Sequence, residues 1–582
     1  MRVHGTIVCM QEAEQTQHSE SFPLAHRPWT KNYNEKTQHD VQLSETSLVY
    51  LLEKAVREVP QKVALQFFGA TTTYAEVGEQ VRQVAEGLRQ AGVVAGDRVA
   101  IILPNCPQHV IAFYAVLRLG AVVVEHNPLY TSAELRHMFE DHRAKVAIVW
   151  DKAADNITAL PADVRPQTIF AVNMIEAIPF HMRVALKLPV KSLRESREKL
   201  EGVARNTKPW KSLLKFAPLD TRYPRPTAQD LALLLYTSGT TGAPKGVMLT
   251  HRNLEANARM GEEWIQPGND EVIYSVLPLF HAYGMTLGLS ISMICQARLV
   301  IFPTVDIDLM LKAMKKTMPT ILPAVPPVYR RLLDEAKKRN ISLQGIRYAV
   351  SGAMNLPHEL VSEWEDYAGG FLVEGYGLTE CAPLVACNPL NDTRRTGSIG
   401  IPFPSTDIRI VDSETLEDVP LGEEGELWVR GPQQFKGYWK REEETRNTVT
   451  AEGWLRTGDI VKIDEDFFLF VVDRIKEVII TGGFNVSPSE VETVLRSHDS
   501  VSDAAVVGFP QKSGGEMVAA AIVPAEGYAI DQEELREFCY ERLTRYKVPR
   551  KIFEVEDLPR SMLGKTLRRE VAQQLREKYD EQ

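Results

Sequence analysis

The chain lacks the cysteine spacings that mark a metal centre or a disulfide framework. Its six cysteines, in 582 residues, form no Cys-x-x-Cys pair and no zinc-ligand spacing. The chain also lacks an excess of positive charge, because its formal net charge is −10, and this balance does not support a nucleic-acid partner. We therefore expect reduced thiols in a reducing compartment, which points to the cytoplasm.

A secretory leader and a membrane-spanning helix are not evident in the sequence. The N-terminal apolar run, residues 6–10, ends before Glu12 and is shorter than the roughly 7–15 residues of a leader's apolar region. Residues 272–297 contain no Asp, Glu, Lys or Arg, but Pro278 and Gly284 interrupt them. Because a spanning helix needs about 20 apolar residues, this broken stretch predicts a buried strand, a loop and a core helix.

Strand-like and helix-like segments alternate along much of the chain. The alternation is clearest between residues 63 and 150 and resumes after residue 231, which favours βαβ units, right-handed crossovers and a mostly parallel sheet. Residues 399–411 and 425–430 then have β character. The sequence therefore predicts an α/β fold with a large N-terminal domain at residues 45–474, built of mixed α/β sheets and a β-rich subdomain. Residues 1–44 are polar, and we expect them to be poorly ordered.

The composition changes after about residue 474. Short strands and helices follow, and residues 475–582 predict a small α+β C-terminal domain. One of its helices begins with a strong start signal, because Ser487 can cap it, Pro488 suits the first helical position, and Glu490 can complete a capping box.

A basic segment stands out at residues 182–216. It contains ten Lys or Arg and three Glu, a local charge of +7, with leucines and valines between them. Such a segment can form a peripheral contact with an anionic membrane, on the inner face if the protein is cytoplasmic. It can equally be the solvated face of a helical insertion, and composition alone favours that second interpretation.

Residues 233–246 predict a phosphate-binding loop. An apolar strand leads into glycines and hydroxyls and ends at one lysine; the residues concerned are Thr237, Ser238, Gly239, Thr240, Thr241, Gly242 and Lys245. Glycines let backbone N–H groups converge on phosphate oxygens, and the lysine adds positive charge. The loop is not a Walker A motif, because Gly246 and a strand, rather than Ser or Thr and a helix, follow the lysine. A flexible linker is the alternative, but a lysine placed after a buried strand argues against it.

Four further features are weak when taken singly. Residues 374–380 combine glycines with Tyr376, which could stack on a planar ring, and Glu380, which could bind a hard cation. Asp459 could accept hydrogen bonds from a ribose, although aspartate is also common in turns. His281 could be an ordinary core residue, and Lys565 a solvated surface charge.

Taken together, these motifs resemble one family. The loop at 236–246 is followed in order by motifs at 278–281, 375–380, 457–459, 473–476 and 564–565. This order is similar to that of the adenylate-forming superfamily of acyl-CoA synthetases, luciferases and peptide-synthetase adenylation domains, and the resemblance covers about residues 45–570.

The resemblance implies a role for each motif. It puts Tyr376 against adenine, Gly377 among the residues that bind ATP or AMP, Thr379 and Glu380 at ATP and Mg²⁺, and Thr237 as a second contact on the metal side. It puts Gly352 and Ala353 along adenine and the acyl group, Asp459 at the ribose with Arg474 nearby, and His281 beside the substrate carboxylate. It makes Lys565 the bridge between that carboxylate and the α-phosphate.

The resemblance also implies two half-reactions and a mobile C-terminal domain. ATP and a carboxylic acid give an acyl-adenylate, and coenzyme A then takes the acyl group. Lys476 would be the hinge, and Gly482 and Gly483 would approach the thiol in the second orientation. Asp473 departs from the pattern, since many relatives have glycine there.

The residues at 127–135 look like those of long-chain fatty acid ligases, so an ATP-dependent fatty acid–CoA ligase is the function we predict. A ligase that loads a carrier protein, a ligase for aryl or medium-chain acids, and a luciferase-like oxidase stay open at this point. A binding protein without turnover is the alternative of another class, but Lys245, Glu380, Asp459 and Lys565 are all present and argue against it. The sequence predicts no oligomeric state.

Overall fold

The computed structural model describes residues 24–237, 244–474, 477, 479–481, 484–510, 516–543, 545–561 and 564–580. Outside the described residues lie Ser238, Gly239, Thr240, Thr241, Gly242, Lys476, Gly482 and Gly483, whose predicted roles therefore stay predictions. The chain divides into two units by its internal contacts. Unit 1 contains residues 1–31, 407–429 and 454–582, and unit 2 contains residues 32–406 and 430–453.

Unit 2 contains an eight-stranded sheet. In spatial order its strands are β19 (Gly437–Tyr438), β9 (Lys245–Thr250), β8 (Leu231–Thr237), β4 (Val122–Glu125), β3 (Arg98–Ile102), β5 (Val146–Trp150), β6 (Thr168–Val172) and β7 (Lys208–Pro209). Strands β8, β4, β3, β5, β6 and β7 run parallel, whereas β9 is antiparallel to both of its neighbours. The predicted parallel sheet is thus confirmed.

Unit 2 also contains a nine-stranded sheet. Its strands, in order, are β16 (Ile401–Pro402), β15 (Leu384–Cys387), β14 (Phe371–Gly377), β13 (Tyr348–Ser351), β12 (Ile321–Ala324), β10 (Val272–Ser275), β11 (Arg298–Ile301), β1 (Val63–Phe67) and β2 (Ala70–Thr73). The central strands from β14 to β1 are parallel, and the edge strands are antiparallel.

The helices of unit 2 connect these strands. They are α2 (Val49–Glu58), α3 (Tyr74–Gln90), α4 (Pro107–Arg118), α5 (Ser132–His142), α6 (Ala154–Thr158), α7 (Phe180–Ala185), α8 (Lys191–Leu200), α9 (His251–Ile265), α10 (Ala282–Met285), α11 (Ile291–Ile294), α12 (Ile307–Met314), α13 (Pro326–Lys338), α14 (His358–Ala368) and α15 (Glu442–Thr448). Short 3-10 turns add η2 (Asp151–Ala153), η3 (Met174–Ala177), η4 (Trp210–Lys215) and η6 (Thr379–Cys381).

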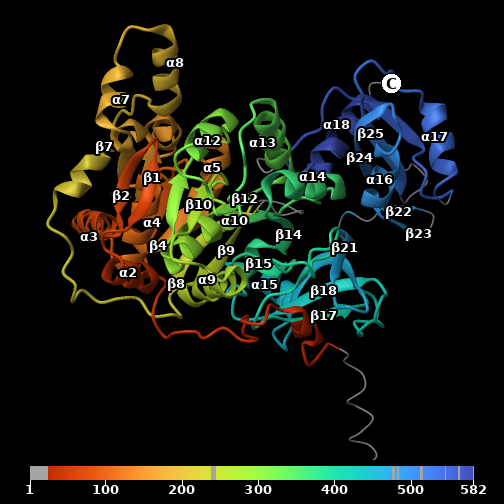
Figure 1. The fold of residues 1–582 in the computed structure, drawn as a ribbon, viewed down its shortest axis with the longest axis horizontal. Helices are drawn as coiled ribbons and strands as arrows, with labels where there is room; N and C mark the ends of the chain where they lie inside the picture. Colours follow the sequence, from red (N-terminus) through yellow and green to blue (C-terminus); the bar gives the residue numbers. More distant parts are fainter. Residues whose placement is uncertain are drawn as a thin grey trace, which may run out of the picture. The chain divides into compact units, whose positions relative to one another are not determined.

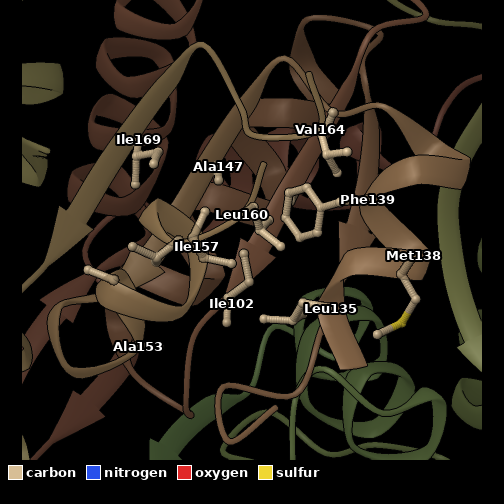
Figure 2. Close-up of a cluster of buried hydrophobic side chains, with 14 residues drawn as sticks. Ile102, Leu135, Met138, Phe139, Ala147, Ala153, Ile157, Leu160, Val164 and Ile169 are labelled. Atoms are coloured by element: carbon tan, nitrogen blue, oxygen red, sulfur yellow. The ribbon is translucent and has the colours of Figure 1, made fainter. Parts of the chain in front are cut away.

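Apolar side chains from helices and strands make the core beside the eight-stranded sheet. Figure 2 shows Leu135 and Phe139 of α5 and Ile157 of α6 gathered near Ile102 and Ala147, which come from β3 and β5. All five are almost completely buried. Burial of each large apolar side chain stabilises the fold by about 1.5–3 kcal/mol, so this cluster fixes the sheet on which the predicted phosphate loop is mounted.

The uncharged stretch at 272–297 folds as the sequence predicts. It forms β10, a loop, and then α10, a π-helical turn η5 (Thr286–Ser290) and α11; the helical segments are buried, whereas His281 in the loop is exposed. Among the described residues, no helix is long and apolar enough to cross a membrane.

Unit 1 combines a β-rich part with the C-terminal residues (Figure 1). Its first sheet has the order β17 (Asp407–Val411), β18 (Gly425–Arg430), β20 (Leu455–Ile463) and β21 (Leu469–Arg474). The strands β22 (Ile479–Thr481) and β23 (Phe484–Val486) pair, and β24 (Val501–Pro510), β25 (Glu516–Pro524) and β26 (Lys551–Glu554) form a third sheet with α16 (Pro488–Arg496), α17 (Gln532–Tyr540) and α18 (Arg568–Asp580). The predicted fold class is confirmed, while the domain boundary at residue 474 stays a prediction.

Two details differ from the sequence predictions. Residues 24–44, which we expected to be poorly ordered, contain a 3-10 turn, η1 (Pro28–Asn32), in which Trp29 is fully buried. One large aromatic side chain can bury enough apolar area to hold a segment whose composition is otherwise polar. Ser487 caps α16 as predicted, but the Glu490 carboxylate binds Lys547 Nζ at 2.7 Å, so a long-range ion pair replaces the second half of the capping box.

Candidate active site

Three of the predicted site segments lie at the carboxyl ends of strands in the nine-stranded sheet. Strands β10, β13 and β14 are parallel members of this sheet, and the segments with His281, Gly352 and Tyr376 follow or end them. Because parallel strands have their carboxyl ends on the same side of a sheet, the fold brings these segments together. This is the side on which α/β sheets bind ligands.

The two strands that flank the phosphate loop are paired with each other. Thr237, the last residue of β8, lies opposite Lys245, the first residue of β9. A side-chain carbon at Gly246 would lie 3.3 Å from the Tyr236 ring and 3.3 Å from Trp439, so both aromatic residues pack directly on the backbone beside Lys245. The two ends of the loop are therefore held in register by strands that belong to the core of unit 2.

Tyr438 connects Glu380 with Lys245. Its hydroxyl donates a hydrogen bond to Glu380 Oε1 at 2.7 Å, and Lys245 Nζ lies 5.3 Å from the centre of its ring. Burial and the neighbouring Glu380 raise the pKa of Tyr438, so the hydroxyl keeps its proton and remains a donor. The sequence analysis missed this residue, although Gly437-Tyr438 is the short strand β19 that pairs with β9 and could have suggested it.

Glu374 and its surroundings shape the loop that carries Gly352 and Ala353. Glu374 lies opposite Ser351 in the strand pair, and its Oε2 accepts a hydrogen bond from the backbone N–H of Leu356 at 3.2 Å. Burial raises the pKa of Glu374 to about 8. Ala353 has a φ of +66°, a left-handed conformation uncommon for alanine, which this anchored loop maintains.

His281 lies next to the same loop. Its Nδ1 accepts a hydrogen bond from the backbone N–H of Tyr283, and a carbon added at Gly352 would lie 3.1 Å from the Tyr283 ring. His281 is exposed at the surface, but many protein atoms lie around its imidazole and displace water from it. This desolvation lowers the pKa of His281 to about 4. The imidazole is therefore neutral at pH 7, and because Nδ1 accepts, the proton lies on Nε2, which can donate one hydrogen bond.

The remaining predicted site residues belong to unit 1. Asp459 is almost fully buried and lies directly opposite Arg474 where β20 pairs with β21. Lys565 lies in a turn in which its backbone carbonyl accepts from the Ser561 N–H at 2.7 Å. The structure thus brings Thr237, Lys245 and Glu380 together in unit 2, and Asp459 and Arg474 together in unit 1.

The sequence matches two known families, one over its larger N-terminal part and one over its C-terminal part. The family described as AMP-binding enzyme matches residues 52–439, and the AMP-binding enzyme C-terminal domain matches residues 490–565. The chain is a member of the AMP-binding enzyme family.

Relatives of this AMP-binding enzyme match it over nearly their whole length. A long-chain-fatty-acid–CoA ligase of Bacillus subtilis is 36% identical over 567 residues, which cover 95% of this chain and 99% of the relative. A ligase of the same name from Salmonella typhimurium is 36% identical over 92% of this chain and 95% of its own. The structure of ATP-bound MatB from Rhodopseudomonas palustris has a TM-score of 0.78 and 29% identity, covering 92% of this chain and 100% of MatB. The resemblance to the adenylate-forming superfamily is thus confirmed.

The aspartate that departs from the family pattern has a structural explanation in this AMP-binding enzyme. Asp473 Oδ2 accepts hydrogen bonds from the Ser487 hydroxyl and from the Ser489 backbone N–H, both at the start of α16. An aspartate there compensates the positive end of that helix. A glycine could provide neither bond.

An arginine that is mostly shielded from solvent completes this region. Arg568 of α18 binds Glu492 through two hydrogen bonds of 2.8 Å, contacts Glu477, and lies 3.8 Å from Asp473. These carboxylates raise the pKa of Arg568 against the opposing effect of its burial. The Arg568 cluster, by which we mean Arg568 with Asp473, Glu477 and Glu492, therefore connects β21, α16 and α18.

Proposed function

We propose that this protein is an ATP-dependent ligase that activates a fatty acid as an acyl-adenylate and transfers the acyl group to coenzyme A. AMP and pyrophosphate are the other products. The observation that carries the proposal is the cluster of Lys245, Glu380 and Tyr438 beside the phosphate loop, in a chain 36% identical over almost its full length to proteins named long-chain-fatty-acid–CoA ligase.

In the first half-reaction, a carboxylate oxygen of the acid attacks the α-phosphorus of ATP and pyrophosphate leaves. No protein nucleophile is required, because positioning and charge stabilisation are sufficient. Tyr376, Gly377, Gly352 and Ala353 bind the adenine side, and Asp459 with Arg474 binds the ribose. Lys245 and the loop residues 237–242 bind the phosphates.

Lys565 supplies the charge at the reacting centre. Its ammonium offsets the repulsion between the carboxylate and the α-phosphate and stabilises the charge that develops between them. His281, neutral at pH 7, donates a hydrogen bond from Nε2 to the acid without adding charge. In the second half-reaction the thiolate of coenzyme A attacks the acyl carbon and AMP leaves, with Lys476 as the hinge and Gly482 and Gly483 beside the thiol.

The residues present suit a magnesium ion bound together with ATP. Mg²⁺ usually takes one or two protein oxygens and completes its six ligands with phosphate and water. Glu380 has one carboxylate oxygen bonded to Tyr438, which leaves the other for a cation, and Thr237 adds a hydroxyl. The described residues contain no group of three or more acidic, His or Cys ligands, in keeping with a metal that arrives with its nucleotide. Bound there, Mg²⁺ would offset phosphate charge.

The enzyme works in the cytoplasm, where ATP and coenzyme A are made available, and a peripheral contact through residues 182–216 brings it to the inner face of a membrane. Long-chain acids partition into bilayers because each buried methylene favours the apolar phase. An enzyme in contact with the membrane therefore meets its acid at a higher local concentration.

Acid-dependent exchange of pyrophosphate into ATP tests the proposal. We expect exchange with long-chain acids, and acyl-CoA formation when coenzyme A is added. Acyl-CoA formation with only shorter or aromatic acids would change the proposed substrate to a medium-chain or aryl acid. Exchange without acyl-CoA formation, with acylation of a carrier protein instead, would make this a carrier-loading ligase. Absence of exchange with every acid would refute acid activation altogether.

A further inference from the structure

A helical hairpin projects from the eight-stranded sheet of unit 2. It comprises α7, the turn after it and α8, residues 180–200, and extends beyond the strands at the upper left of Figure 1. It leaves the sheet after β6 and returns at β7, which is the edge strand. Neither α7 nor α8 contains a buried residue, and within residues 180–200 only Leu186, in the turn, is buried, so this hairpin contributes little to the core.

The base of the hairpin is fixed to unit 2. The indole N–H of Trp150 donates to the Leu200 carbonyl at 3.2 Å, and the Asn173 side chain donates to Glu201 at 3.0 Å. Lys152 Nζ donates to the Glu198 carbonyl at 2.8 Å. The tip, which we define as residues 180–194, thus extends from an anchored base.

The tip exposes an apolar stripe. Phe180, Val184 and Leu188 are spaced by four residues, and their exposed fractions are 73%, 48% and 52%. Val190 is also exposed at 48%. Single exposed apolar residues are normal on a protein surface, but four within eleven residues of a projecting hairpin form a patch that calls for a partner.

Basic side chains border this stripe. Arg183, Lys187 and Lys191 repeat at the same spacing of four, one residue from the apolar series, and Arg194 follows. No acidic residue occurs between Glu176 and Glu195. The contacts of these side chains are weak: Arg183 lies over the Phe180 ring, and Lys191 pairs at 3.9 Å with Glu195 while both members of that pair are well exposed.

Charge complementarity identifies the partner. The chain carries a net charge of −10 and as a whole is repelled by an anionic surface, so a local basic patch would determine which face approaches it. Apolar side chains flanked by Lys and Arg suit the boundary between anionic headgroups and acyl chains. A purely solvated face would explain the basic residues but not the exposed Phe180 and Leu188.

We propose that residues 180–194 are a docking surface for an anionic phospholipid bilayer. The inference rests on the peripheral contact proposed above and specifies the residues and the lipid charge. Phe180, Val184 and Leu188 insert among the headgroups, and the neighbouring Lys and Arg bind lipid phosphates. The rest of the hairpin acts as a rigid stalk.

Vesicle co-sedimentation of the full chain tests the proposal. The vesicles are phosphatidylcholine alone, or phosphatidylcholine mixed with phosphatidylglycerol. We expect binding to the anionic vesicles only, weakened by salt because surface charges are screened. Replacing Lys187 and Lys191 with Gln should weaken binding by about fivefold for each residue. The Phe180→Ser, Leu188→Ser variant should weaken it at least as much.

A matched control changes two exposed apolar residues elsewhere, with Val94→Ser and Tyr528→Ser, whose parent side chains are exposed at 54% and 56%. This control should bind vesicles like the unchanged protein. Binding of the hairpin variants at the unchanged level, or no binding of the unchanged protein to anionic vesicles, would overturn the proposal. Ligase activity on a long-chain acid, carried in solution by albumin and without vesicles, is measured in parallel. It should be equal in all variants, and its absence from the unchanged protein would count against the enzymatic function rather than the docking surface.

Discussion

Two sites, one in each unit, use their charged side chains in opposite ways. At the candidate active site of unit 2, Glu380 is held by a neutral hydroxyl, and among the described residues neither it nor Lys245 forms an ion pair. In unit 1, Arg568 is surrounded by three carboxylates. The difference shows that one region keeps its charges available for a ligand, whereas the other uses its charges to fix the positions of β21, α16 and α18.

The strongest test of this comparison removes a charge that we assign to the reaction. Lys565→Ala should reduce acid-dependent ATP–pyrophosphate exchange by orders of magnitude, because it removes the ammonium that we place between the carboxylate and the α-phosphate. Thioesterification of a supplied acyl-adenylate should continue. Loss of both half-reactions would instead indicate a structural role for Lys565.

The second test removes the charge that we assign to structure. Arg568→Met leaves Asp473, Glu477 and Glu492 without their common cation, and truncation of one partner in such a buried cluster costs about 3–5 kcal/mol. We expect a loss of that size in the free energy of unfolding, measured with a chemical denaturant. Arg569→Met, at the exposed neighbouring position, is the control and should change it by less than about 0.5 kcal/mol. Equal effects of the two changes would contradict the role of the Arg568 cluster.

Glu374 shows what burial does to a carboxyl group that forms no ion pair with any of the described residues. Its pKa of about 8 in the folded state lies above the ordinary value of 4.5, so the folded protein holds a proton that the unfolded chain releases. Stability should therefore fall as the pH rises from about 4.5 to 8, by an amount on the order of a few kcal/mol. Glu374→Gln should remove this dependence, which thermal unfolding across that pH range measures. Glu359→Gln, exposed, should retain it; an unchanged slope in Glu374→Gln would refute the explanation.

The smallest expected effect concerns Tyr438. Tyr438→Phe removes the hydrogen bond to Glu380, and a bond to a charged group is worth about 1.5–3 kcal/mol. We expect the KM for magnesium–ATP in the exchange reaction to rise about tenfold or more, with little change in kcat or unfolding temperature. Tyr528→Phe, at an exposed site, is the control. A lower unfolding temperature with an unchanged KM would mean that the hydroxyl only stabilises the fold.

The motifs and most elements could be predicted because they depend on short-range patterns. The alternation between residues 63 and 150 appears as β1 to β5 with their helices, and the strand at 247–249 appears within β9. Tyr438 could not be predicted as a partner of Glu380, since 58 residues separate them and only the pairing of β19 with β9 brings them together. The sequence of the basic hairpin can be interpreted in two ways, and the exposure of its apolar side chains, which supports our docking proposal, is visible only in the structure.

The sequence by itself determined the chemistry available to this protein: a hydroxyl-rich loop ending at Lys245, an acidic residue at Glu380 and a lysine at Lys565, in the order of one family. Residue types and their spacing along the chain carry that information. Only the tertiary structure decided which groups neutralise, protonate or position one another, as with Arg568 and Asp473 or Tyr438 and Glu380. Burial and contact between distant residues determine those properties, and both arise only when strands and helices pack.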